Sequence, residues 1–221
     1  MLFIFSRPNM KRLSFIFCLA IALFSCAEEK KNTVIALQTL NFFPDFYVDS
    51  ISSIVGREYG LEVKILPNCK IPDQYFSNSK TPRYRADSIL NFLSKNKQDE
   101  VQHILGLTCV DISTTKRNEK GEIEAPVDFY ENWAVFGLAN NNKPGAIVST
   151  FRVQGPNQKL VIQRMQKVSI HYIGHNIGLP HCDSTYCSMH ANVESFNTVD
   201  LIGIGLCSNC KKKAQQLCPK N

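Results

Sequence analysis

Residues 171–181 read HYIGHNIGLPH, and they hold three of the five histidines in the chain. His171 and His175 are four residues apart at the end of a helical pattern, so both imidazoles project from one face of that helix. Gly178 permits a sharp turn after the helix, and His181 follows three residues later. This spacing predicts a zinc site with three imidazole ligands and one open coordination position.

The stretch resembles the metzincin consensus H-E-x-x-H-x-x-G-x-x-H, which a methionine turn follows. The cysteines after His181 narrow the resemblance to the archaemetzincin family, and the resemblance covers roughly residues 33–210. It implies a metzincin-like zinc-peptidase domain with a mixed sheet, an active-site helix and a small cysteine-rich subdomain. The segments that resemble the family upstream are Ile104–Thr108 with Val110 and Asp111, Val135–Gly137, Val148–Ser149, Arg152 and Arg164.

The resemblance also implies a second, structural zinc, and so two zinc ions per chain. By matching positions its ligands are Cys182, Cys187, Cys207 and Cys210, and Met189 forms the turn beneath the active site. Two disulfides are the rival interpretation, because an exported protein favours them. The paired spacing of Cys207 and Cys210, with a separate upstream pair, favours zinc. The residues without a derived role are Cys69, Cys109, Cys218 and His103, whereas His190 could lie near the site because it follows the methionine.

Tyr172 stands where the consensus has glutamate. In active members of the family that glutamate takes a proton from zinc-bound water and delivers it to the leaving amine. A phenol has a pKa of about 10 and is a poor general base at neutral pH. We therefore expect weak or absent peptidase activity. Glu194 or Asp183 could replace the base, and Tyr172 could act as a proton donor or as a fourth zinc ligand, but the motif specifies none of these roles.

Apolar spacing along the rest of the chain predicts alternating strands and helices, with a loop over Pro67–Thr81 and a charged insertion over Thr114–Pro126. The order indicates one α/β (α+β) domain over residues 33–177. Residues 178–221 form a zinc and methionine-turn subdomain that needs metal to hold its shape. The expected strands are Thr33–Leu37, Leu61–Leu66, Val101–Leu107, Trp133–Leu138 and Ala146–Val153, and the expected helices are Phe46–Tyr59, which Gly60 ends, Arg85–Leu93 and Leu160–Ile177.

The first 25 residues are typical of an export signal, because basic residues precede an apolar run over Leu13–Phe24 that is too short for a bilayer span. The run ends in a sequence that resembles a lipobox, so we expect lipidation of Cys26 and a tether over residues 26–32. Plain secretion is the alternative. The expected location is the bacterial cell envelope, on the outer membrane. Loss of residues 1–25 lowers the formal charge from +6 to +3, too little to indicate nucleic-acid binding.

Two functions follow from these features. The first is a zinc metallopeptidase domain, weak or inactive because of Tyr172, that acts on peptides or proteins from a lipid anchor. The second is a non-catalytic, zinc-stabilised lipoprotein that holds an extended peptide by strand addition along Trp133–Leu138. A third interpretation is a cysteine-rich envelope protein that is cross-linked by disulfides. In each case we expect a monomer.

Overall fold

The computed structural model describes residues 33–219, apart from 79–80, 142–143, 192 and 194. The expected leader, Cys26 and the tether lie outside the described residues, as does Glu194. Within the described part, no helix is both long enough and apolar enough to span a bilayer.

Five strands form the main sheet, in the order β2-β1-β5-β9-β8. The parallel strands are β1 (Val34–Leu40), β2 (Glu62–Cys69), β5 (His103–Thr108) and β9 (Ala146–Ser149), and β8 (Gly137–Ala139) is antiparallel to β9 at the edge. Helices cover both faces, which explains why β9 is buried along its whole length. The mixed sheet confirms the predicted fold class, although the strand predicted over Ala146–Val153 ends at Ser149.

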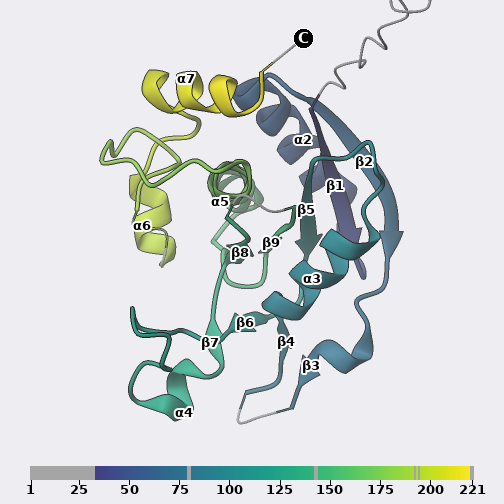
Figure 1. The fold of residues 1–221 in the computed structure, drawn as a ribbon, viewed down its shortest axis with the longest axis vertical. Coiled ribbons are helices and arrows are strands. Elements are labelled where there is room, and N and C mark those ends of the chain that lie inside the picture. Colours follow the sequence, from purple (N-terminus) through teal and green to yellow (C-terminus); the bar gives the residue numbers. More distant parts are fainter. Residues whose placement is uncertain (1–32, 79–80, 142–143, 192, 194, 220–221) are drawn as a thin grey trace, which may run out of the picture. The chain divides into compact units, whose positions relative to one another are not determined.

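Three helices pack on this sheet (Figure 1). Successive side chains of β1 point to opposite faces, so Leu37 joins the core under α2 (Asp45–Tyr59) and α5 (Gln158–Ile177), while Ala36 joins the core under α3 (Ala86–Asn96). The predicted helices are confirmed with shifts of at most three residues at their ends. Gly60 adopts a left-handed φ of 65° and ends α2 as predicted.

A second sheet was not predicted. It has the order β3-β4-β6-β7 and contains β3 (Phe76–Ser77), β4 (Arg83–Arg85), β6 (Ile112–Thr114) and β7 (Trp133–Ala134). The prediction of one strand over Trp133–Leu138 is wrong, because its first part pairs with β6 in this sheet and its last part becomes β8 of the main sheet. Pro67–Thr81 is also not wholly a loop, since it contains the 3-10 turn η1 (Asp73–Tyr75) and β3. Strands of two or three residues carry too little periodicity to be recognised.

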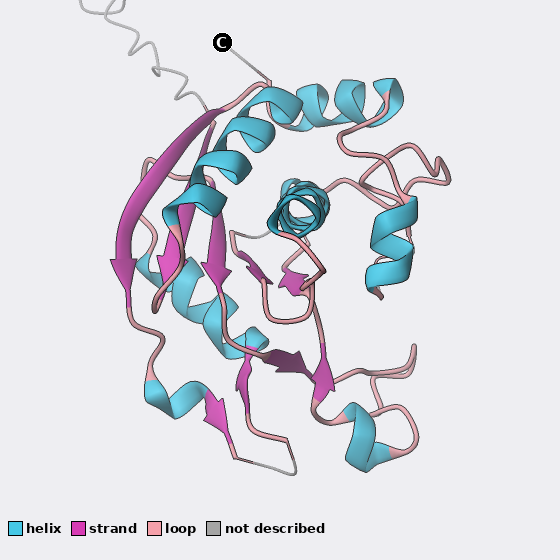
Figure 2. Ribbon diagram, turned by 180° about the vertical axis from the view of Figure 1, so that it is seen from behind, coloured by secondary structure: helices cyan, strands magenta, loops and turns pink. Residues whose placement is uncertain are grey.

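Three short helices complete the described chain. α4 (Val127–Tyr130) follows the charged insertion, and α6 (Phe196–Leu201) and α7 (Ser208–Leu217) lie in the cysteine-rich region. Figure 2 shows α5 end-on between the main sheet and this region. Helix α5 therefore lies between both parts of the fold, and it contacts β9 on one side and α6 and α7 on the other.

Candidate metal centre

Helix α5 positions the first two histidines. Asn157 caps its start, since the Asn157 side chain accepts a hydrogen bond from the Leu160 N–H at 2.9 Å. Gly178 ends it with φ 106°, and the Gly178 N–H donates to the carbonyls of Gly174 and His175. The chain reverses there, and His181 returns to the helix. The turn predicted at Gly178 is confirmed.

The three histidine side chains meet through their Nε2 atoms. Nε2 of His175 lies 3.0 Å from that of His171 and 3.1 Å from that of His181. In a tetrahedral zinc site with Zn–N bonds of about 2.0–2.1 Å, the nitrogens are about 3.3 Å apart. The cluster is therefore near the size that one zinc ion requires, and His181 is exposed at its outer side.

Hydrogen bonds on the opposite ring nitrogens select the tautomer. His171 Nδ1 donates to the Ser188 carbonyl at 2.8 Å, and His175 Nδ1 donates to the Leu179 carbonyl at 3.0 Å. The Nε2 atoms of His171 and His175 are then unprotonated, and their lone pairs point into the cluster. A bound cation can accept both lone pairs. Burial lowers the pKa of His171 to about 3, and it also lowers the pKa of His175, so both rings are neutral at pH 7.

Met189 packs directly beneath the helix. It is fully buried, and a Cβ placed on Gly174 would lie 2.2 Å from its sulfur. Gly174 is in the turn between the two helical histidines, so the absence of a side chain there lets the methionine approach the backbone of the metal-binding turn. The methionine predicted to underlie the site does contact this helix.

Ser188 connects this turn to a more distant part of the chain. Its hydroxyl donates to the Gly203 carbonyl at 3.0 Å and accepts from the Gly205 N–H at 3.0 Å. The next N–H, of Leu206, donates to Glu58 of α2 at 2.9 Å. A chain of hydrogen bonds therefore joins α2 to the carbonyl that orients His171. The sequence carried a signal for Glu58, a carboxylate on the apolar face of the first helix, which we did not interpret.

Four thiols gather in a second cluster. The Sγ atoms of Cys182, Cys187, Cys207 and Cys210 all lie within 4.8 Å of one another, and those of Cys182 and Cys207 are 3.9 Å apart. Zn–S bonds of about 2.3 Å in a tetrahedron place the sulfurs about 3.8 Å apart. None of the seven described cysteines forms a disulfide. The geometry therefore fits a closed four-thiolate metal site.

Backbone amides point at these sulfurs. The Cys207 N–H donates to Cys187 Sγ at 3.3 Å, and the Cys210 N–H donates to Cys207 Sγ at 3.5 Å, where Cys207 caps α7. Burial opposes ionisation of Cys207, but these amide and thiol hydrogen bonds lower its pKa to about 7. Burial instead raises the pKa values of Cys187 and Cys210. One thiolate is thus available at neutral pH before any metal binds.

Tyr172 lies against the edge strand. A Cβ on Gly137, the first residue of β8, would lie 2.5 Å from Cε2 of the Tyr172 ring, so the ring packs on the bare backbone of that glycine. The ring is half-buried and stands nearly perpendicular to the His171 imidazole, with centroids 5.2 Å apart. The residue that replaces the consensus glutamate therefore sits between the histidine cluster and β8, while Asp183 is exposed.

Asn176 links α5 to the start of β5 and to the loop before β9. It is fully buried, its Oδ1 lies 2.9 Å from His103 Nδ1, and its amide donates to the Gly145 carbonyl at 3.1 Å. Cys218 Sγ lies 3.7 Å from His103 Nε2. Burial raises the pKa of Cys218 and lowers that of His103, so the thiol stays protonated and unreactive. This cluster gives His103 and Cys218 structural partners that the sequence did not reveal.

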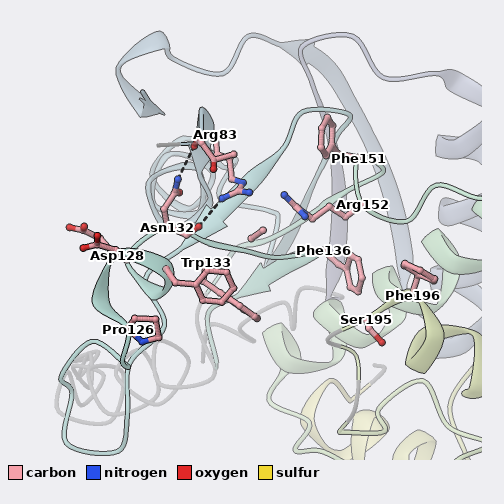
Figure 3. A pocket seen from close by; sticks show the side chains of 14 residues that line it. Arg83, Pro126, Asp128, Asn132, Trp133, Phe136, Phe151, Arg152, Ser195 and Phe196 are labelled. Carbon is pink, nitrogen blue, oxygen red and sulfur yellow. Dashed lines mark hydrogen bonds between the residues drawn. The ribbon is translucent and has the colours of Figure 1, made fainter. Parts of the chain in front are cut away.

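A cavity of about 920 Å³ lies beside the edge strand (Figure 3). Its walls come from the start of β4, the ends of β7 and β9, α4 and the start of α6. Five aromatic side chains line it together with Arg83 and Arg152. The aromatic residues are Phe129, Trp133, Phe136, Phe151 and Phe196.

Comparison with known sequences identifies one family. The model of peptidase family M54 matches residues 31–216. An archaemetzincin of Haloquadratum walsbyi is 29% identical over 170 residues, which cover 73% of this chain and 87% of the relative. An archaemetzincin of Methanopyrus kandleri is 29% identical over 179 residues, which cover 78% of this chain and 92% of that protein.

Solved structures lead to the same family. The crystal structure of the Methanopyrus kandleri archaemetzincin superposes with a TM-score of 0.68 and 25% identity, over 86% of this chain and 98% of that one. An archaemetzincin of Archaeoglobus fulgidus, solved with malonate, gives a TM-score of 0.62 and 25% identity, over 82% of this chain and 99% of that one.

Proposed function

The chain belongs to the archaemetzincins, peptidase family M54, and we propose that it is a zinc peptidase of that family in which Tyr172 makes peptide-bond hydrolysis weak or absent. The observation that carries this proposal is the convergence of three Nε2 atoms beside an aromatic ring, where a carboxylate would be needed. We also propose that His171, His175 and His181 hold one zinc and that Cys182, Cys187, Cys207 and Cys210 hold a second, structural one.

Zinc bound by the histidines would polarise the scissile carbonyl and make a neighbouring water more acidic. The protein must then accept a proton from the attacking water and return it to the leaving amine. Tyr172 has no carboxylate for this task, and its ring is held against Gly137. Loss of a positioned base reduces the rate by about 10² to 10⁴. The three histidines and the buried methionine of the motif are present, so the missing carboxylate is what separates this site from the consensus.

A second function, peptide binding without turnover, is supported by the edge strand. β8 ends the main sheet, and within the described part of the chain no other strand pairs with its outer edge. An extended peptide can add to such an edge through main-chain hydrogen bonds. The Tyr172 ring packs on the face of β8 at Gly137, so this edge lies close to the histidine cluster.

Residue 172 distinguishes the two functions. We expect Tyr172→Glu to cleave a mixture of peptides at least about 100-fold faster than the parent protein, because a positioned base contributes about 10² to 10⁴. The rate is measured by mass spectrometry of the products. Tyr172→Phe controls for loss of the hydroxyl, and His171→Ala in the Tyr172→Glu background should abolish cleavage. Equal rates for parent and Tyr172→Glu, both lost in His171→Ala, would contradict the role given to Tyr172.

We further propose that lipid on Cys26 anchors the domain in a bacterial envelope, on the outer membrane. The apolar run that stops at this cysteine and the charged tether after it support the anchor.

A further inference from the structure

The cavity beside β8 is not used by the hydrolytic chemistry proposed above. It lies at the junction of the two sheets, where β7 ends and β8 begins, and it is lined by side chains from five different elements or their ends (Figure 3). Its volume of about 920 Å³ is within the range of ligand sites and larger than one side chain requires.

Five aromatic side chains give its walls a large apolar surface. Phe129 and Trp133 contact each other edge-on with centroids 5.1 Å apart and form one wall. Phe136 and Phe196 lie across from Trp133 in Figure 3. Phe196 is 48% exposed, yet the Arg164 guanidinium lies 5.2 Å from its ring, so the exposed ring is held in place. Such walls favour a large apolar side chain of a ligand.

A pair of arginines supplies a positive charge within this apolar lining. Arg152 binds Asp111 with two hydrogen bonds of 2.7 Å, and Arg83 donates to the same carboxylate at 2.8 Å. Two guanidinium groups thus share one carboxylate, which leaves one net positive charge on these three groups. Two further carboxylates, of Asp128 and Glu131, line the cavity elsewhere. Among the described residues, neither Nη1 of Arg152 nor Nη2 of Arg83 has a hydrogen-bond partner. Figure 3 shows Asp128 pointing away from this pair. The pair suits a carboxylate ligand.

The cavity is connected to the metal centre by a short piece of chain. Trp133 lines the cavity, and four residues later Gly137 contacts the Tyr172 ring next to His171. At about 3.3 Å per residue, this run spans about 13 Å, or about four residues of an extended peptide. A peptide that adds antiparallel to β8 runs from Ala139 toward Trp133, so its carboxyl-terminal end enters the cavity.

We propose that this cavity binds the C-terminal residue of a peptide, with the free carboxylate on Arg152 and Arg83 and a large apolar side chain between the aromatic walls. The inference rests on the proposed function, because it places the peptide along β8. It restricts the ligands of this protein to polypeptide ends, with the metal centre facing a bond about four residues from the terminus.

The chain has a single tryptophan, and it lines the cavity, so its fluorescence reports occupancy directly. The probe is an acetylated alanine peptide that ends in leucine, prepared with a free carboxylate and with a carboxamide, titrated into the zinc-loaded protein. We expect the free acid to bind at least about tenfold more tightly than the amide. In Arg152→Gln the preference should fall below about twofold. In the control Arg117→Gln, an exposed arginine outside the cavity, it should remain.

Equal affinity of acid and amide for the parent protein overturns the inference, and this comparison needs no variant. Retention of the preference in Arg152→Gln also overturns it. Failure of both peptides to bind does so as well. The proposed function is judged separately, by the hydrolysis that Tyr172→Glu acquires. An active Tyr172→Glu variant without a carboxylate preference would thus leave the family chemistry in place and remove only the role of the cavity.

Discussion

At the scale of single residues, two helical glycines have different surroundings. Gly174 faces the Met189 sulfur, whereas a Cβ on Gly56 of α2 would make only ordinary contacts, with its nearest neighbour Val63 at 3.4 Å. Alanine in a helix is more favourable than glycine by about 1 kcal/mol. Whether a Gly→Ala substitution at these two positions stabilises or destabilises the protein therefore depends on whether the added methyl group fits.

We expect Gly174→Ala to lower the free energy of unfolding by about 1–3 kcal/mol, because a methyl group must displace the buried methionine beneath the metal-binding turn. Gly56→Ala is the matched control and should be neutral or stabilising by up to about 1 kcal/mol. Urea denaturation measures both, and zinc content measures the effect on the site. A Gly174→Ala protein as stable as the parent would show that Met189 does not constrain this turn.

Glu58 gives stability a dependence on pH. Burial alone would raise the pKa of Glu58, but hydrogen bonds from the Leu206 N–H and from Lys211 outweigh burial and hold the pKa below its usual value. The ionised form is therefore the stabilising one. Its contribution is present above the pKa of the unfolded chain, about 4.5, and is lost as the pH falls through the lowered folded pKa.

In Glu58→Gln we expect the free energy of unfolding at pH 7 to fall by about 1–3 kcal/mol, because the Leu206 amide loses a charged acceptor. The difference from the parent should shrink as the pH is lowered below about 4.5, where the parent carboxylate also becomes neutral. Urea midpoints across pH provide the measurement, and Glu62→Gln at the exposed start of β2 is the control. A difference that is constant with pH would exclude the proposed ionised role.

At the scale of elements, the region after α5 has little secondary structure of its own. Its described residues between Gly178 and α7 contain one helix of six residues, α6. The four thiols hold this region together, Met189 packs on α5, and Leu206 and Lys211 bind Glu58 of α2. Arg164 and Lys167 of α5 bind α6 through Asp200 and the Val199 carbonyl. A bound metal in the thiol cluster would therefore decide whether this region stays folded.

We expect the purified protein to contain two zinc ions per chain, and Cys210→Ser to lose one of them. The melting temperature of the variant should fall by an amount on the order of 10 °C. Loss of the metal removes several kcal/mol from the free energy of unfolding, and each kcal/mol lowers the melting temperature by about 2–4 °C. Hydrogen exchange should increase over residues 182–210 and remain slow in β1 and β5. Cys69→Ser, outside the cluster, is the control. Unchanged metal content in Cys210→Ser, or disulfides in the purified protein, would contradict the structural zinc.

At the scale of the whole molecule, the proposed lipid anchor determines where the domain acts. Cys26 lies outside the described residues, seven before the first described residue of the chain. We expect the parent protein to fractionate with membranes and to carry acyl groups, detectable by mass spectrometry. Cys26→Ser should be found in the soluble fraction with the same zinc content, because the anchor is separate from the folded domain. Membrane association that survives Cys26→Ser would require a different anchor.

The histidine spacing, the turn at Gly178, the family and the mixed fold could all be predicted from the sequence. Each depends on residues close together in the chain, where helical geometry fixes the distance between His171 and His175. Long apolar runs also predicted the three long helices and the strands β1, β2 and β5 of the main sheet, because they contain several periods of their pattern.

The tertiary structure alone decided the rest, since it depends on contacts between residues far apart in the chain. It divided Trp133–Leu138 between two sheets, placed Tyr172 on Gly137, and brought Glu58 to within hydrogen-bond distance of the Leu206 amide, 148 residues away. It also assembled the aromatic cavity from segments that carry no shared motif. Such contacts leave no periodic signal in the sequence, because folding brings together surfaces whose local patterns are independent.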